Sequence, residues 1–159
     1  MPDILTQHNI GALGDLVRMS DHFSATAGGA GNNATFTGIS LDRMGFGLGA
    51  LARTALVGVL YEATLASGKT LSLGYDLQHA PDNATWTDFQ TATGVVVATG
   101  VSGGTTAKGE FNFQVDLTSA QRYIRFNTIP NLSATGVDTC YGDVAGFVAG
   151  FERLAAPNI

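Results

Sequence analysis

Positive charge is scarce in this sequence. Among its 159 residues there are eight Lys and Arg against 13 Asp and Glu, and the formal net charge is −5 at pH 7. The few basic residues are spread along the chain, whereas a surface that binds nucleic acid or an anionic membrane carries Lys and Arg in clusters. We therefore expect neither nucleic acid nor a membrane as a partner.

Cysteine and long apolar runs are also lacking. Cys140 is the only cysteine, which excludes an intrachain disulfide and a zinc site with several cysteines. The most apolar stretch, residues 44–61, contains glycines and has Arg53 near its middle, unlike a helix that spans a membrane. The first residues include Asp3 and no basic segment, unlike a secretory signal. We expect a chain that is made and folds in a cytoplasm.

Motifs of catalytic sites are missing as well. No G-x-S-x-G nucleophile elbow occurs, and the glycine-rich stretches "GGAGNN" and "GFGLG" lack the P-loop lysine and the G-x-G-x-x-G spacing. The three histidines, His8, His22 and His79, stand at no metal-ligand spacing such as H-x-x-x-H. We therefore expect no enzymatic activity, no cofactor and no metal.

Glycine and alternating apolar residues are abundant. There are 21 glycines, nearly twice the usual share of about 7%. In "TLSLGYDLQ", residues 70–78, large apolar residues alternate with small or polar ones, which predicts a strand with one face on a core. The same pattern recurs in "EFNFQVDL", residues 110–117, and in "RYIRFNTI", residues 122–129. We expect two further short strands in "VVVATG" and "AGFVAGF".

The segment of residues 50–68 is ambiguous, because its apolar residues fit a helix or a strand. Gly58 and the β-branched residues favour a strand from about Thr54 onward. The chain then has about seven or eight short strands separated by Gly, Asn, Asp and Pro turns. This spacing is typical of an antiparallel β-sandwich, so we predict an all-β, jelly-roll-like sandwich.

The first 34 residues differ from the rest. Residues 24–33, "SATAGGAGNN", include no large apolar residue, and we expect no packed element there. Apolar residues between positions 10 and 17 fit a short helix or an extended arm. We predict that residues 1–34 form an N-terminal arm that orders against a partner and that residues 35–159 form the β-sandwich domain; the alternative is a terminus without a partner. The arm residues expected to contact the partner are Leu13, Leu16, Val17, Arg18 and Phe23.

A turn and the only tryptophan follow the clearest strand. Residues 81–83, Pro-Asp-Asn, favour a tight turn. We expect Trp86 to cover the end of the core rather than to bind a ligand. One alternative is a Ca²⁺ site built from the hard oxygens of nearby side chains, although they match no EF-hand loop. These side chains are Asp76, Asp82, Asn83 and Asp88.

Two segments of the chain resemble small jelly-roll virion proteins of tailed bacteriophages. They are residues 63–90, "ATLASGKTLSLGYDLQHAPDNATWTDFQ", and residues 119–139, "SAQRYIRFNTIPNLSATGVDT". In that family a strand after "GKTLSL", a turn with Asp and Asn, "TW-x-DF" and a later "RYIRF" strand recur within one β-sandwich. Such proteins are usually head decoration (cement) proteins.

The resemblance implies a structural virion protein without enzymatic activity. It would bind the outer surface of a phage capsid and stabilise the shell by bridging capsid subunits. The implied partners are the major capsid protein and copies of the chain itself, for instance in a trimer. The implied location is the capsid surface of the virion, after synthesis in the cytoplasm of the bacterial host.

The same segments also resemble discoidin-like and other carbohydrate-binding sandwiches. Those proteins share a turn–Trp segment like "PDNATW" and an arginine-bearing strand like "RYIRF". The chain departs from them because it has no cysteine pair and no evident row of aromatic residues. This alternative implies a module for host attachment. Its expected glycan contacts are Asp82, Asn83, Trp86, Arg122 and Arg125.

Overall fold

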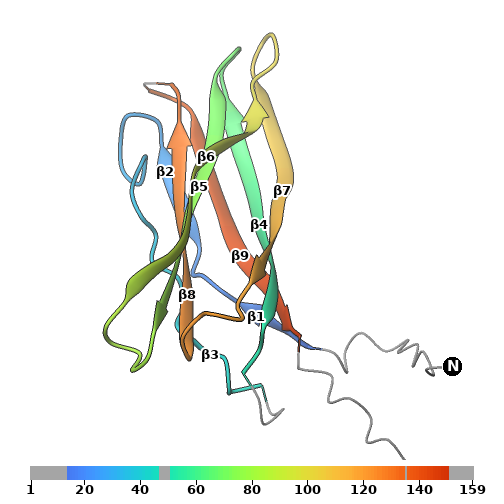
Figure 1. The fold of residues 1–159 in the computed structure, drawn as a ribbon. Helices are drawn as coiled ribbons and strands as arrows, with labels where there is room; N and C mark the ends of the chain where they lie inside the picture. Colours follow the sequence, from blue (N-terminus) through green and yellow to red (C-terminus); the bar gives the residue numbers. More distant parts are fainter. Residues whose placement is uncertain (1–13, 47–50, 135, 151–159) are drawn as a thin grey trace, which may run out of the picture.

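The computed structural model describes residues 14–46, 51–134 and 136–150. Within them all regular secondary structure is β, and the strands form two antiparallel sheets packed face to face (Figure 1). The strands are β1 (Gly14–Arg18), β2 (Phe23–Thr26), β3 (Leu41–Asp42), β4 (Thr54–Leu65), β5 (Thr70–Ala80), β6 (Thr87–Thr99), β7 (Thr105–Asp116), β8 (Tyr123–Leu132) and β9 (Thr139–Ala149). The described residues include no helix long and apolar enough to cross a membrane.

The two sheets are built mainly from strands that are distant in the sequence. Sheet A has the order β1-β9-β4-β7, with β2 also paired to β9, and sheet B has the order β3-β8-β5-β6. Among the described strands, only β5 and β6 are consecutive in the chain and also paired. The predicted all-β antiparallel sandwich is confirmed, with nine strands where seven or eight were expected.

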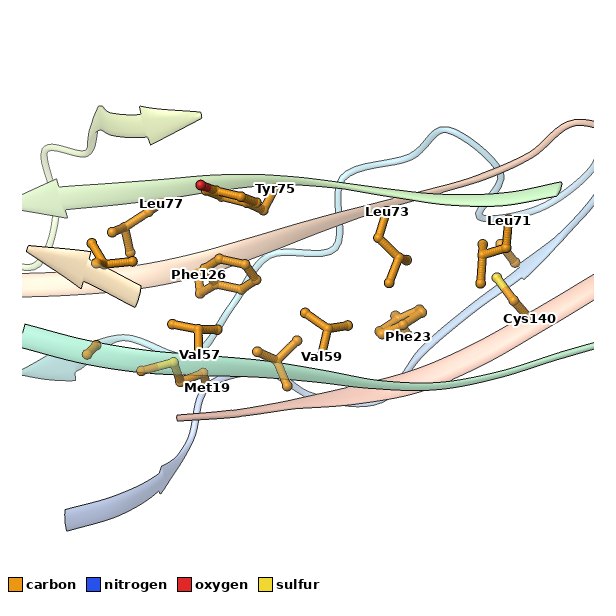
Figure 2. Packing of buried hydrophobic residues seen from close by; sticks show 14 of the residues in the cluster. Met19, Phe23, Val57, Val59, Leu71, Leu73, Tyr75, Leu77, Phe126 and Cys140 are labelled. Carbon is orange, nitrogen blue, oxygen red and sulfur yellow. The ribbon is translucent and has the colours of Figure 1, made fainter. Parts of the chain in front are cut away.

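The core lies between the sheets and takes alternate side chains from each (Figure 2). In β5 the predicted alternation is present, since the four large apolar residues of the segment 70–78 are all buried. Tyr75 of β5 stacks on Phe113 of β7, with ring centroids 4.2 Å apart. Phe126 of β8 lies 5.4 Å from each of these two rings. This aromatic cluster joins sheet A to sheet B.

The ambiguous segment forms a central strand. β4 begins at Thr54 and pairs with β7 on one side and with β9 on the other. Ala55, Val57 and Val59 are buried, whereas the residues between them face away from the core. The preference for a strand over a helix is therefore confirmed.

Part of the predicted N-terminal arm is built into the sandwich. β1 and β2 both pair with β9, and the side chains of Met19 and Phe23 lie in the core (Figure 2). They are 2% and 0% exposed. Both side chains reach the core because β9 has glycines opposite them. A Cβ atom at Gly142 would lie 2.6 Å from the Phe23 ring, and one at Gly146 would lie 2.4 Å from the Met19 methyl group.

The structure therefore differs from the expectation for residues 24–33. Ala25 and Ala27 are buried on alternate positions beside exposed Ser24 and Thr26, a strand pattern that the small and glycine-rich composition concealed. That residues 1–34 order against a partner stays a prediction.

Arg43 is a fully buried arginine at one end of the sandwich, with 1% of its surface exposed. Its Nε donates to the carbonyl of Ala52 at 2.8 Å, and Nη2 donates to the carbonyls of Leu117, at 2.6 Å, and Ala52. Nη1 donates to the carbonyls of Gln121, at 2.9 Å, and Ala120. Burial lowers the pKa of the guanidinium, and the charge of Arg53 acts in the same direction. Because all five N–H donors are used, Arg43 ties the β3–β4 segment to the β7–β8 loop.

We expect Arg43→Met to lower the free energy of unfolding by about 3–5 kcal/mol, because several buried carbonyls lose their donor. Urea unfolding followed by the fluorescence of Trp86 measures the change. The matched control is Arg122→Met, which removes an exposed pair with Asp42 and is expected to cost much less. Equal losses of unfolding free energy for the two variants would show that the buried hydrogen bonds of Arg43 stabilise the fold no more than an exposed ion pair does.

Candidate interaction surfaces

The outer face of sheet A is apolar where β1, β9 and β4 lie side by side. Phe147 of β9 is the register partner of both Leu16 and Leu56, so the three side chains form one row. Leu16, Leu56 and Leu60 are 78%, 45% and 51% exposed, although the solvated face of an antiparallel sheet is usually polar. We name as the leucine patch the residues Leu16, Leu56, Leu60, Ala145 and Phe147.

Gly58 forms the floor of a hollow in the leucine patch. It lies between Leu56 and Leu60 on β4, and a pocket of about 360 Å³ opens over it. A Cβ atom at Gly58 would meet only the carbonyl oxygen of Ala145 within 4 Å, at a distance of 3.8 Å. The hollow therefore results from a missing side chain, and a side chain of a partner can enter it.

Ion pairs lie beside the leucine patch, near Leu60. Arg18 lies 3.3 Å from Asp21 and 4.0 Å from Asp143. On the other side, Nζ of Lys108 lies 2.6 Å from Glu62, and this hydrogen bond lowers the pKa of Glu62 and raises the pKa of Lys108. An apolar centre with a charged rim is the usual composition of a protein–protein interface.

The outer face of sheet B has a polar network around Trp86. The guanidinium of Arg125 lies over the Trp86 ring, 4.4 Å from its centroid, and its Nε donates to Gln78 at 2.8 Å. The amide of Gln78 donates in turn to Asp88, also at 2.8 Å. Trp86 is half-buried under Arg125 and is outside the hydrophobic core, so the expectation that it covers the end of the core was wrong.

A second pocket, of about 440 Å³, lies beside this network and is lined by Asp76 and Asp88. Oδ2 of Asp76 accepts a hydrogen bond from Asn127 at 3.2 Å, whereas Oδ1 is buried and has no hydrogen-bond partner in the described part of the chain. Burial raises the pKa of Asp76, and the charge of Asp88 raises it further. Sequence reasoning missed the partner Asn127, because nothing local links it to Asp76.

The four residues of the Ca²⁺ alternative do not all meet at this pocket. Asp76 and Asp88 line it, and Asp82 and Asn83 are not among its lining residues. Within the described residues there is no group of three or more His, Cys, Asp or Glu that could hold a metal ion.

The proposed glycan contacts have several structural roles of their own. Asp82 accepts hydrogen bonds from the backbone and the hydroxyl of Thr85, at 2.8 and 3.0 Å, and the backbone bond lowers its pKa. Asn83 has a φ of 61° and accepts a hydrogen bond from Ser40. Arg122 forms a two-pronged pair with Asp42, at 3.0 and 2.7 Å. Of the predicted set, the structure brings together Trp86 and Arg125.

The predicted arm contacts are divided between surface and core. Leu16 belongs to the leucine patch, and Arg18 lies at its rim. Val17 is half-buried against the core, and the side chain of Phe23 is fully buried in it. Leu13 lies outside the described residues.

Sequence reasoning missed Leu56, Leu60 and Phe147 as surface residues. The signal was present in residues 54–65, "TALVGVLYEATL", where apolar residues occupy both alternating sets of a strand. A strand with one polar face cannot have this pattern.

No protein-family model matches the sequence, and neither does any curated protein. Solved structures with a similar fold come from infectious bursal disease virus. The crystal structure of its viral particle is 17% identical over 86% of this chain and 31% of that chain, with a TM-score of 0.48. A structure of the Gx strain is 18% identical over 87% and 33%, with a TM-score of 0.43. A VP2 subviral particle is 15% identical over 86% and 32%, with a TM-score of 0.44. The chain spans about a third of the length of these structures, and the likeness concerns the fold alone.

We expect Asp76→Asn to stabilise the protein near neutral pH. Because the folded pKa of Asp76 is raised above 3.8, the folded protein binds this proton more tightly than the unfolded chain, and stability falls as the pH rises through this range. The gain from Asp76→Asn should therefore be present near pH 7 and vanish near pH 3, where the carboxyl is protonated in both states. Urea unfolding at the two pH values measures the difference.

The matched control for this prediction is Asp116→Asn. Hydrogen bonds from Thr118 lower the pKa of Asp116, so the substitution should lower stability near pH 7, the opposite sign. If Asp76→Asn raised the free energy of unfolding equally at both pH values, the buried charge of Asp76 would not be the cause of the gain.

Proposed function

We propose that this protein is a structural component of a virion and that it binds protein subunits of a viral shell through the leucine patch. The observation that carries the proposal is the apolar row on the outer face of sheet A, formed by exposed Leu16 and Leu56 and half-buried Phe147. A contiguous apolar surface with a charged rim marks a site of protein contact. The scarcity of Lys and Arg argues for a protein partner over a nucleic acid.

The energetics favour many weak contacts over one strong contact. Each exposed leucine that becomes fully buried contributes about 1–2 kcal/mol, whereas association costs on the order of 4–15 kcal/mol in lost freedom. A single copy therefore binds weakly through this patch. On a shell, copies bound to neighbouring sites reinforce one another wherever they also touch.

The finer proposal is a decoration protein on the outer surface of a tailed-phage capsid. Its support is the resemblance of residues 63–90 and 119–139 to head decoration proteins. In this proposal the chain bridges subunits of the major capsid protein, and the acidic body faces outward. Leu16 and Arg18 are the exposed members of the predicted arm that would contact the shell.

The carbohydrate-binding alternative depends on Trp86 and Arg125. A sugar normally packs against an aromatic face, and one face of Trp86 is covered by Arg125. We therefore expect no saturable change in Trp86 fluorescence during titration with a broad panel of glycans. A saturable shift that is lost in Arg125→Ala would support host attachment instead.

The proposal is tested with shells assembled from the major capsid protein of the virus that encodes this chain. We expect the chain to sediment with the shells and to saturate at a copy number within a few-fold of the shell subunit. Gly58→Gln should reduce the affinity at least tenfold, because the new side chain fills the hollow while its Cβ has no clash. Quantitative mass spectrometry of the pellet measures the bound copies.

The matched control is Gly29→Gln, in an exposed turn away from the patch, where a Cβ atom would also have only ordinary contacts, the nearest at 3.5 Å. This variant should bind as the unmodified chain does. Circular dichroism confirms that both variants are folded. Equal binding by both variants would exclude the leucine patch, and no binding by the unmodified chain would exclude the virion role.

A further inference from the structure

The outer edge of β7 is a long strand edge without a partner in the described structure. β7 pairs with β4 over all twelve of its residues, from Thr105 to Asp116, without a shift of register. It is the last strand of sheet A, and no other described strand pairs with its outer side. Every second residue therefore directs its backbone N–H and C=O groups outward.

The remaining edges of the sandwich are shortened or interrupted. β6, at the edge of sheet B, has three shifts of register against β5, and β3 at the opposite edge has two residues. The edge formed by β1 and β2 is broken between residues 18 and 23. Bulges and short strands are the features that prevent one sheet edge from pairing with another. β7 has neither, and it has no proline.

We propose that the edge of β7 pairs with β7 of a second copy, antiparallel and about a two-fold axis at Gly109. The argument is charge complementarity. In this register Lys108 of each copy lies directly opposite Glu110 of the other copy. The two side chains point to the same outer face, because they are two residues apart and both are exposed.

Other strand registers, in which the two-fold axis passes through another residue of β7, are less favourable. An axis at residue 108 or 110 places like charges directly opposite each other, which destabilises a strand pair. An axis at residue 107 or 111 leaves both charges without an opposite charge across the edge. Of these registers, the pairing centred on Gly109 is the one that places each Lys108 opposite a Glu110 of the other copy, in addition to the ion pair of Lys108 with Glu62 in its own chain.

The paired copies would form one continuous sheet A. Glu110 and Asn112 line the hollow of the leucine patch, so two leucine patches would lie on one common outer face, on either side of the axis. This arrangement gives a dimer, in place of the trimer that the resemblance implies. The pairing itself does not depend on binding to a viral shell.

The test is the mass of the full chain in solution, measured by sedimentation equilibrium over a range of concentrations. We expect a monomer–dimer equilibrium. Glu110→Lys and Lys108→Glu should each weaken the dimer about tenfold or more, because each places like charges opposite each other. An equimolar mixture of the two variants should recover dimers, because the lysines of one then face the glutamates of the other.

The matched control is Gln114→Lys, which adds a lysine on the same face of β7 but outside residues 105–113, and it should leave the dimer unchanged. Circular dichroism shows whether each variant is folded. A chain that is monomeric at all concentrations, or trimeric, would overturn the proposal. So would a dimer that both charge variants leave intact. Dimers that form while shell binding fails would reject the proposed function and keep this pairing.

Discussion

The guanidinium of Arg43 couples the two sheets at one end of the molecule. Its acceptors belong to the segment before β4 and to the loop between β7 and β8, while Arg43 itself follows β3. β4 and β7 belong to sheet A and β3 and β8 to sheet B. A buried charge is tolerated only when its hydrogen bonds are complete, so the two loops have to present their carbonyls at fixed positions. The alignment of the sheets, and with it the geometry of both outer faces, depends on this condition.

The centres of the two outer faces differ in chemistry although the sheets share one core. On sheet A the outward residues of β4 are leucines around Gly58, and on sheet B the outward residues of β5 include Asp76 and Gln78. Side chains on sheet B form hydrogen bonds with one another through Arg125 and Asn127. Leucine side chains cannot do so in water. A protein with one hydrogen-bonded polar face and one face with an apolar patch is suited to lie on a partner with the apolar patch inward.

The fold class could be predicted from several short alternating segments separated by turns, of which residues 70–78 are the clearest, because alternation follows directly from the geometry of a half-buried strand. Phe23 was not recognised as a core residue, since its pocket depends on glycines of β9 more than a hundred residues away. The burial of Arg43 could not be predicted either, because its hydrogen-bond partners are backbone carbonyls and no characteristic side chain marks them. The leucine patch was hidden for another reason, since apolar residues on both sides of β4 do not reveal which set faces the core.

The position of β9 in sheet A has a consequence for synthesis. β9 lies between β4 and the pair β1 and β2, yet it is the last of the described strands to leave the ribosome. Until residues 139–149 emerge, β1 and β2 lack their strand partner, and the edge of β4 that will pair with β9 is unpaired. Pairings over such sequence distances form slowly. The nascent chain therefore passes through a stage in which one edge of β4 is unpaired, and unpaired strand edges are prone to aggregation.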